Sequence, residues 1–457
     1  MFRKILIANR GEIAITIIRA CREMGIRSVA VFSEADRQAL HAQLADESIC
    51  IGPAPPQSSY LNPQALLAAC SITGAEAIHP GFGFLSENAA FATMCAKMHI
   101  TFIGPSPETM RLMGDKATAR ETASNAGVPI TPGSTGIVTD LAMAQAEAER
   151  IGYPVMVKAA SGGGGRGMRI AREPEELKNA FMAARVEAKA AFGDDRVYIE
   201  RFLQNPRHVE IQLMADQYGN VVHYGDRDCS IQRRNQKMIE EATSPFVDRH
   251  LRRQMGEVAI RLAAAVGYTG AGTVEFLVDA EKSFYFMEMN TRIQVEHPVT
   301  EAITGTNLIK EQIRVAAGYR LSQQQNEISF IGHAMECRIN AEDPLNNFLP
   351  TPGVIKNLVV PGGLGVRIDS ALYPGYEIPS YYDSMLAKVI VHAPTRREAI
   401  ARMRRVLTEF LIEGVKTNID FHLLILRDPE FIAGDYDIGY LGRKLPQMIH
   451  DLQERQG

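Results

Sequence analysis

Apolar runs and helical patterns alternate in the first part of the chain. The run Ile5–Ala8 has no polar alternation, a helical spacing of apolar residues follows over 12–24, and a second apolar run covers Val29–Phe32. A strand, a helix and a strand in this order form the unit of a parallel sheet. Two further short strands, at 77–78 and 101–103, lead into Pro/Gly loops. We therefore expect an open, parallel α/β domain here.

The pattern changes in the middle of the chain. A linking helix over 110–116 leads to a stretch rich in Gly and Pro at 127–133, which we interpret as a hinge. A small unit of strands and one helix follows, and we expect this unit, about 132–203, to move as a lid. Beyond it the strands become antiparallel, with a helix over 249–266 and a hairpin over 272–290.

Length and composition limit the classes of protein. A chain of 457 residues is expected to form about three domains at roughly 150 residues each; we place them at 1–114, 115–330 and 331–457. Hydrophobic residues make up 46% of the chain and charged residues 22%, as in globular proteins. The net charge of -4 gives no sign of nucleic-acid binding or of an anionic membrane surface.

The cysteines and the N-terminus indicate the compartment. The six cysteines show no C-x-x-C pair and no zinc-binding spacing with histidine, so we interpret them as reduced thiols. The first apolar run is too short for a signal peptide, and no stretch approaches the ~20 apolar residues that span a bilayer. We expect a cytoplasmic protein.

A glycine-rich segment, Ser161–Gly167, lies between two predicted strands. Its backbone amides, free of bulky side chains, suit the binding of phosphates. The segment is not a Walker loop, because Lys158, the candidate phosphate lysine, precedes the glycines instead of following them. A flexible hairpin tip would have a similar composition.

The hairpin over 272–290 carries candidate metal ligands. If residues 279–282 form the turn, Glu275 opposes Phe286, and Glu275, Glu288 and Asn290 share one face. The two carboxylates are then diagonal neighbours, with Cβ atoms roughly 7 to 8 Å apart. Oxygen ligands at such a spacing suit magnesium bound to nucleotide phosphates. The alternative is a solvent-facing edge with ordinary surface acids.

Two further segments concentrate charge. If the chain stays extended after the hairpin, Arg292, Gln294 and Glu296 point to the side of Glu288, which makes an anion site with a base inside it. Residues 228–237 gather cations that suit a polyphosphate, although a surface salt-bridge cluster would look similar.

Arg338 lies on a predicted strand with one apolar and one polar face. On that pattern alone, its side chain faces either a cleft or water.

Together these segments resemble the biotin carboxylase branch of the ATP-grasp superfamily, over nearly the whole chain. The matching stretches are 7–14, 79–88, 113–116, the glycine segment, 205–210, 227–237, 288–298, 337–342 and 381–385. The resemblance implies an α/β (α+β) architecture. In it, 1–114 forms a Rossmann-like pre-ATP-grasp domain, 115–330 the ATP-grasp domain, and 331–457 the C-terminal biotin carboxylase domain.

The resemblance also implies an activity. A family member uses ATP, Mg²⁺ or Mn²⁺ and bicarbonate to carboxylate biotin on a biotin carboxyl carrier protein, through carboxyphosphate. This is expected to be the first half-reaction of acetyl-CoA carboxylase in fatty acid synthesis, or else of a pyruvate or another acyl-CoA carboxylase. Remote alternatives are another ATP-grasp ligase and a nucleotide-binding regulator without turnover. The implied partners are the carrier, carboxyltransferase subunits and a second copy of the chain.

The family's site residues transfer to matching positions. The resemblance implies that ATP phosphates are bound by Lys116, Lys158, Gly164 and Gly165. It implies that the rest of the nucleotide is bound by Glu200, Arg201, Phe202, Leu203, His208, Gln232, Asn235 and Leu277. The implied metal ligands are Glu275, Glu288 and Asn290. The implied bicarbonate residues are Lys237, Arg292, Gln294, Val295 and Glu296, of which Glu296 is the general base, and Arg338 meets the biotin ureido group.

The sequence departs from the family pattern at a few positions. Phe82 stands where Tyr is common, Asn235 where many members have His, and Thr243 where Pro is usual. Thr16 replaces an Arg that contributes to the homodimer in some members. No Lys lies between two methionines, as the biotinylated lysine of a carrier domain does, so we expect the carrier to be a separate protein.

Overall fold

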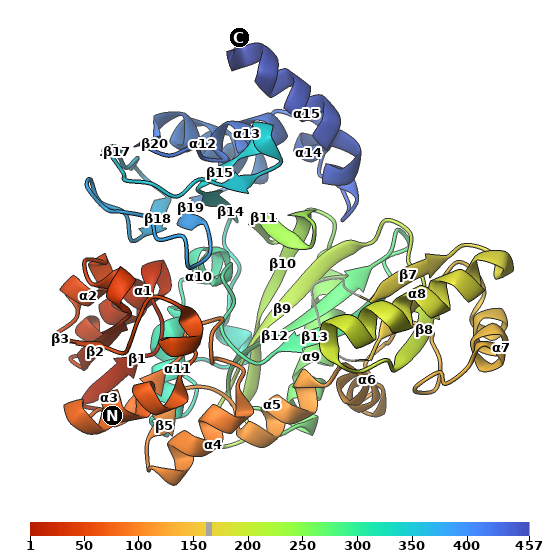
Figure 1. The fold of residues 1–457 in the computed structure, drawn as a ribbon, viewed down its shortest axis with the longest axis horizontal. Coiled ribbons are helices and arrows are strands. Elements are labelled where there is room, and N and C mark those ends of the chain that lie inside the picture. Colours follow the sequence, from red (N-terminus) through yellow and green to blue (C-terminus); the bar gives the residue numbers. More distant parts are fainter. Residues whose placement is uncertain (161–166, 457) are drawn as a thin grey trace.

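Parallel strands build the N-terminal part of the computed structural model, which describes residues 1–160 and 167–456 (Figure 1). The five-stranded sheet has the order β3-β2-β1-β4-β5, and all its neighbouring strands are parallel. Its strands are β1 (Lys4–Ile7), β2 (Arg27–Phe32), β3 (Glu47–Cys50), β4 (Ala77–His79) and β5 (Thr101–Phe102). The expected Rossmann-like architecture is confirmed.

Helices cover this sheet because their apolar faces need burial. They are α1 (Gly11–Glu23), α2 (Leu40–Leu44), α3 (Pro63–Thr73) and α4 (Ala89–Lys97). In α1, Ile13 and Ile17 lie in the core with β1, one helical turn apart. The loops that follow β1 and β4, at 8–10 and 80–83, leave the carboxyl ends of neighbouring parallel strands, where ligands bind in open α/β sheets.

The predicted linking helix is in fact two helices, α5 (Pro107–Gly114) and α6 (Lys116–Asn125). Asp115 breaks the helix because its backbone is extended and its side chain accepts a hydrogen bond from the backbone N–H of Thr118. It is therefore an N-cap, which starts a new helix instead of continuing the old one. The break sets Lys116 in the first turn of α6.

The small unit predicted at about 132–203 has a sheet and a core of its own. The sheet has the order β7-β6-β8, with β6 (Val155–Ala159), β7 (Met168–Ala171) and β8 (Val197–Arg201). Helices α7 (Leu141–Ile151) and α8 (Pro174–Phe192) pack on it around Val157, Phe181 and Ile199. The chain enters and leaves this unit side by side, since the backbone N–H of Arg201 donates to the Pro132 carbonyl.

An antiparallel sheet of eight strands forms the centre of the molecule, in the order β13-β12-β9-β10-β11-β14-β19-β18. Its strands are β9 (Arg207–Ala215), β10 (Val221–Arg233), β11 (Gln236–Ala242), β12 (Gly270–Val278), β13 (Phe284–Asn290), β14 (His333–Asn340), β18 (Val366–Ser370) and β19 (Met385–Ala393). The sheet is continuous across residue 330, because β11 pairs with β14. Helices α9 (Arg249–Ala265), α10 (His297–Thr304) and α11 (Leu308–Ala316) pack against it.

The last part of the chain forms a second large core on this sheet. Helix α12 (Arg396–Glu409) covers β14 and β19, with α13 (Ile419–Ile425), α14 (Pro429–Ala433) and α15 (Tyr440–Gln456) beyond it. Two short ribbons pair β15 (Glu342–Asp343) with β16 (Leu349–Pro350) and β17 (Asn357–Val359) with β20 (Leu411–Glu413). Within the described residues, none of the helices has the length and hydropathy needed to cross a bilayer.

Candidate active site

A cavity of about 1050 Å³ lies where the parallel sheet, the small unit, the central sheet and the C-terminal part meet. The predicted site residues in its wall are Lys116, Lys158, His208, Gln232, Asn235, Lys237, Glu275, Leu277, Glu288, Asn290, Arg292, Gln294, Val295, Glu296 and Arg338. Of the predicted residues that the structure describes, Glu200 to Leu203 do not line it. Gly164 and Gly165 lie outside the described residues. One cavity thus brings together residues that are far apart in sequence.

The hairpin of β12 and β13 has a different register from the predicted one. Glu275 directly opposes Glu288, and Phe276, not Glu275, opposes Phe286. The prediction was wrong because the turn includes Ser283 and a bulge at the next step inserts Met287. The two carboxylates are therefore nearest neighbours across the strands and not diagonal ones.

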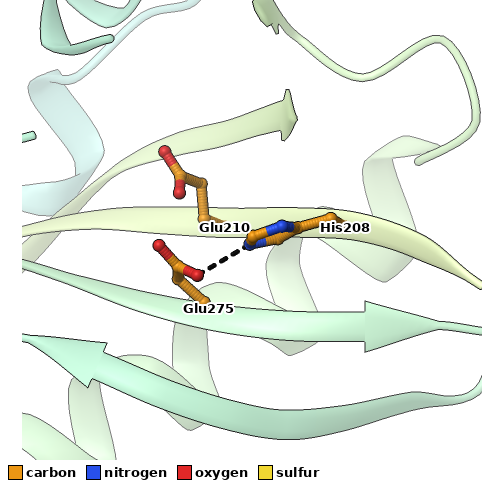
Figure 2. Close-up of side chains that lie close together, drawn as sticks. All are labelled: His208, Glu210 and Glu275. Carbon is orange, nitrogen blue, oxygen red and sulfur yellow. Dashed lines mark hydrogen bonds and ion pairs between the residues drawn. The ribbon is translucent and has the colours of Figure 1, made fainter. Parts of the chain in front are cut away.

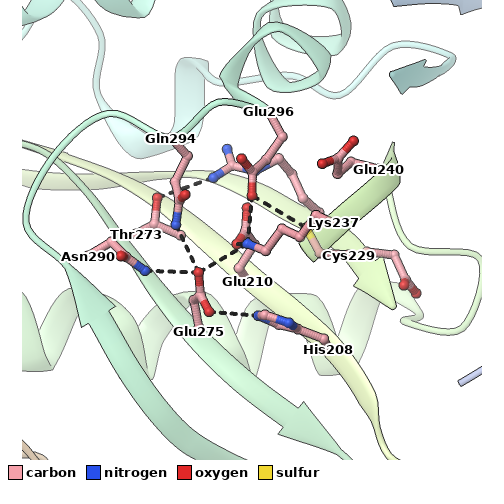
Figure 3. A network of polar contacts seen from close by, with 12 residues as sticks. His208, Glu210, Cys229, Lys237, Glu240, Thr273, Glu275, Asn290, Gln294 and Glu296 are labelled. Atoms are coloured by element: carbon pink, nitrogen blue, oxygen red, sulfur yellow. Dashed lines mark hydrogen bonds and ion pairs between the residues drawn. The ribbon is translucent and has the colours of Figure 1, made fainter. Parts of the chain in front are cut away.

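Lys237 is the centre of the buried polar network (Figure 3). Its ammonium nitrogen lies 2.7 Å from a carboxylate oxygen of Glu210, 3.1 Å from one of Glu275 and 2.6 Å from one of Glu296. Burial alone would lower the pKa of Lys237, but the surrounding thiol and carboxylate groups raise it well above its ordinary value. The lysine therefore stays charged and neutralises part of the acidic cluster.

Among the residues that the structure describes, two groups of side chains have the spacing of metal ligands, one of them formed by His208, Glu210 and Glu275 (Figure 2). The imidazole Nε2 of His208 lies 2.8 Å from Glu275 Oε2. Burial opposes protonation, but the charge of Glu275 raises the pKa of His208. With Lys237 inside the same cluster, a further cation is repelled there. In the second group, formed by Glu210, Cys229 and Glu296, both carboxylates contact the same ammonium.

The open side of the hairpin suits a divalent cation better. Asn290 and Gln294 each donate to Glu275 Oε1 at 2.9 Å. Glu288 has a weaker contact, with Oε2 3.8 Å from the Lys116 ammonium. Burial and the facing charge of Glu275 raise the pKa of Glu288. Two opposed carboxylates, one of them weakly compensated, fit a site for Mg²⁺, which needs few protein ligands.

Glu296 sits between two cations and is fully buried. Its Oε1 contacts Lys237, and its Oε2 accepts a hydrogen bond of 3.1 Å from the Arg338 guanidinium. Burial would raise the pKa of this carboxyl, but Lys237 and Arg338 hold it well below its ordinary value. Glu296 is therefore an ionised acceptor at neutral pH, with cations beside it that suit an anionic ligand.

Arg338 also contacts a second buried carboxylate. Its Nε donates to Glu240 Oε1 at 2.6 Å. Burial raises the pKa of Glu240 to about 7, against the lowering effect of Arg338. The polar face of β14 thus faces the cavity, which resolves the alternative that the sequence pattern left open.

The segment after β13 does not stay extended to its end, as the prediction assumed. It turns at Val295 and Glu296, and α10 starts at His297. The three predicted side chains nevertheless reach one cavity. Arg292 donates to Asn290 Oδ1 at 3.0 Å and pairs with Glu87, from the loop after β4, at 2.8 Å.

The predicted nucleotide residues lie at the side of the small unit. Lys158 forms an ion pair with Glu200, which keeps that carboxylate behind the cavity wall. Asn235 lies in the tight turn between β10 and β11 with φ of 65°, a left-handed conformation that Asn tolerates well. Leu277 contributes an apolar wall.

Sequence reasoning missed several charged residues of the network. Glu210 and the fully buried Arg227 form an ion pair beneath Lys237, and Glu87 holds Arg292. One signal was available: His208, Glu210 and Gln212 alternate on a predicted strand, and in a strand such residues share a face. Their burial is a tertiary feature that this alternation does not reveal.

Family models match three consecutive parts of the chain. Residues 1–110 match the biotin carboxylase N-terminal domain, 115–324 the ATP binding domain of the carbamoyl-phosphate synthase L chain, and 336–443 the biotin carboxylase C-terminal domain.

Known proteins are similar over nearly the full length. The chain is 58% identical over 442 residues to biotin carboxylase 1 of Bacillus subtilis, covering 96% of this chain and 98% of that one. It is 56% identical over 438 residues to the chloroplastic biotin carboxylase of Arabidopsis thaliana, covering 96% and 82%.

Solved structures agree. A biotin carboxylase from Campylobacter jejuni, in complex with β-γ-ATP, superposes with a TM-score of 0.93 at 50% identity, covering 97% of this chain and 99% of that one. The biotin carboxylase domain dimer of the Hydrogenobacter thermophilus 2-oxoglutarate carboxylase, with MgADP, ADP and bicarbonate, gives 0.92 at 48%, covering 98% and 99%. This chain belongs to the biotin carboxylase family.

Proposed function

We propose that the protein is an ATP-dependent biotin carboxylase, which uses bicarbonate to carboxylate biotin on a separate carrier protein. One observation carries the proposal: an ionised, buried Glu296 lies between Lys237 and Arg338 in the same cavity as the opposed carboxylates Glu275 and Glu288. A base between cations, next to a place for metal and phosphates, is what the activation of bicarbonate by ATP needs.

The nucleotide occupies the side of the cavity next to the small unit. Lys116 and Lys158 bind its phosphates together with Gly164 and Gly165. The base and ribose bind near His208, Gln232, Asn235 and Leu277, and the predicted residues Glu200, Arg201, Phe202 and Leu203 lie behind this part of the cavity wall. Glu275, Glu288 and Asn290 would hold magnesium, or manganese, which when bound would mask the negative charge of the phosphates.

Bicarbonate binds among Lys237, Arg292, Gln294, Val295 and Glu296. Glu296 accepts the proton of bicarbonate, and the freed oxygen attacks the γ-phosphorus as its bond to ADP breaks. The products are carboxyphosphate and ADP, and Lys237 and Arg292 stabilise the anionic charge that remains. Because the pKa of Glu296 lies well below its ordinary value, the carboxylate is ionised at neutral pH, and the same cations that keep it ionised also weaken it as a base.

The second step takes place at Arg338. Carboxyphosphate breaks into carbon dioxide and phosphate, the phosphate accepts the N1 proton of biotin, and the resulting ureido enolate attacks carbon dioxide. Arg338 stabilises the enolate charge. Since Arg338 already contacts both Glu296 and Glu240, biotin must compete with these carboxylates for the guanidinium, which ties the two steps together.

The remaining features concern the assembly. We keep the division of the chain into 1–114, 115–330 and 331–457, with 132–203 as a lid; the family-model matches at 1–110, 115–324 and 336–443 support it. The protein acts in the cytoplasm as a homodimer with a biotin carboxyl carrier protein and carboxyltransferase subunits. Acetyl-CoA is the favoured final acceptor, because curated relatives include free-standing bacterial and chloroplastic biotin carboxylases; a pyruvate carboxylase subunit with 49% identity makes pyruvate the alternative.

The proposal is tested by measuring ADP release with and without bicarbonate and free biotin. A biotin carboxylase needs bicarbonate for turnover and is stimulated by biotin. Another ATP-grasp ligase would ignore both additions, and a nucleotide-binding regulator would release no ADP. Either of these results would contradict the proposal.

A further inference from the structure

Lys388 is a fully buried lysine that the mechanism above does not use. It lies on β19 directly opposite Arg338 of β14, so both side chains point to the same face of the sheet. Its ammonium nitrogen donates a hydrogen bond of 2.9 Å to the backbone carbonyl of Val295. Val295 precedes Glu296 in the chain. A buried cation thus holds the peptide unit from which the proposed general base extends.

The same ammonium reaches the N-terminal part of the molecule. It lies 3.1 Å from Glu12 Oε1, on α1, and 5.9 Å from the ring centroid of Phe82, in the loop after β4. On the C-terminal side, Asp369 of β18 lies 3.9 Å away. Lys388 therefore joins segments that are distant in sequence at one point behind the cavity wall.

The local geometry makes this contact important for Glu296. Glu296 has φ of -81° and ψ of 8°, and its backbone starts α10 instead of continuing the extended segment. The Val295 carbonyl precedes that helix and is partly buried, so losing its donor would be costly. Without Lys388, the turn would relax toward another partner and carry the Glu296 carboxylate with it.

We propose that Lys388 is a positioning residue for bicarbonate activation: by binding the Val295 carbonyl and Glu12 together, it fixes the Glu296 turn against the N-terminal domain. This inference rests on the proposed function. Lys388 has no contact with the proposed phosphate or metal residues in the described structure, so its effect is confined to the bicarbonate end of the cavity.

The test compares K388M with E12Q and with the double variant E12Q/K388M. Met keeps the length of the side chain but not the hydrogen bond. K388M leaves Glu12 buried without its cation and loses thermal stability; the double variant removes both charges and regains much of it. In both, we expect kcat/KM for bicarbonate to fall by about tenfold to a hundredfold, because a small misplacement of a catalytic group has an effect of that size. The KM for ATP should change little.

The controls separate a positioning role from a structural one. E12Q alone keeps the Lys388 bond to Val295, and the amide oxygen of Gln can still accept from the Lys388 ammonium, so this variant should retain most of the bicarbonate kcat/KM. R252M breaks another buried ion pair, with Asp226, away from the cavity, and should lower stability without changing the bicarbonate KM.

Several results would overturn the inference while the wild type shows bicarbonate-dependent ATPase activity. One is a double variant with unchanged bicarbonate kinetics. Another is an equal loss of kcat/KM for ATP and for bicarbonate. A third is failure of both K388M and the double variant to fold, which would show that Lys388 serves the fold alone. A wild type without that ATPase activity would instead contradict the proposed function.

Discussion

At the scale of single residues, the direct opposition of Glu275 and Glu288 gives the metal site its sharpest test. E288Q keeps the size of the side chain and removes one charged ligand. We expect metal-dependent ATPase activity to fall by more than the roughly tenfold that losing an outer-shell partner costs. The matched control is E281Q, in the exposed turn of the same hairpin, which should behave as the wild type. Normal activity of E288Q at ordinary magnesium would rule out the site.

Arg338 separates the two steps of the reaction. In R338Q the cation that we propose to stabilise the biotin enolate is lost, whereas Lys237 and Arg292, the proposed bicarbonate residues, remain. We expect biotin-independent, bicarbonate-dependent ATPase activity to persist and carboxybiotin formation to fall by about a hundredfold. Because Arg338 also pairs with Glu296, a parallel loss of both activities would mean that it serves bicarbonate or the fold instead.

At the scale of secondary-structure elements, the small unit is expected to close over the nucleotide. Its two connections lie side by side, joined by the Arg201–Pro132 backbone hydrogen bond, and it has a separate core. Such an arrangement suits rotation as one body. Binding of a non-hydrolysable ATP analogue should slow amide hydrogen exchange in β6 and β7 and leave α12 unaffected. Unchanged exchange in β6 and β7 would contradict closure.

Strand β11 and helix α12 are joined by a buried carboxylate. Glu241 contacts Arg396 and His333. Burial opposes its ionisation, but these partners lower the pKa of Glu241 to about 2, from an ordinary 4.5. The folded pKa is the lower one, so the stability gained from ionisation, on the order of 3 kcal/mol, is present above pH 4.5 and is lost as pH falls toward 2.

E241Q should therefore melt at a lower temperature than the wild type at pH 7, and the difference should shrink as the pH falls below 4.5. The control is E409Q, which alters the exposed Arg405–Glu409 pair and should have little effect at either pH. A difference in melting temperature that stays constant with pH would show that Glu241 does not titrate as described.

Elements were more predictable than their exact pairing. Apolar periodicity was enough to predict β1, α1 and β2, because these segments bury a continuous face. The same periodicity predicted one helix over 110–116. The structure has two helices there, because the Asp115 carboxylate caps the start of the second one. The register of β12 and β13 depends on a bulge at Met287, which changes no hydrophobic position and therefore leaves no periodic signal.

The candidate site was predictable where chemistry is concentrated in short segments, such as 288–298. It was not predictable where single residues from distant elements converge. Lys388, Glu12 and Glu87 are ordinary charges in the sequence, and only the tertiary structure brings them to the segment that contains Glu296.

At the scale of the whole molecule, one cavity is lined by residues from the N-terminal, middle and C-terminal parts of the chain, so the proposed nucleotide, bicarbonate and biotin residues share a common space. The network of Lys237, Arg338 and Lys388 around Glu296 is shared by the central sheet and the N-terminal domain. We expect this construction to couple ATP cleavage to biotin carboxylation.

The most direct test is to measure the transfer of isotope-labelled bicarbonate to a biotinylated carrier protein together with ADP release. We expect label on the carrier only when ATP and a divalent metal ion are both present, with one carboxyl group transferred for each ADP formed under coupled conditions. ATP cleavage that leaves the biotin unlabelled, or that proceeds equally without bicarbonate, would contradict the account.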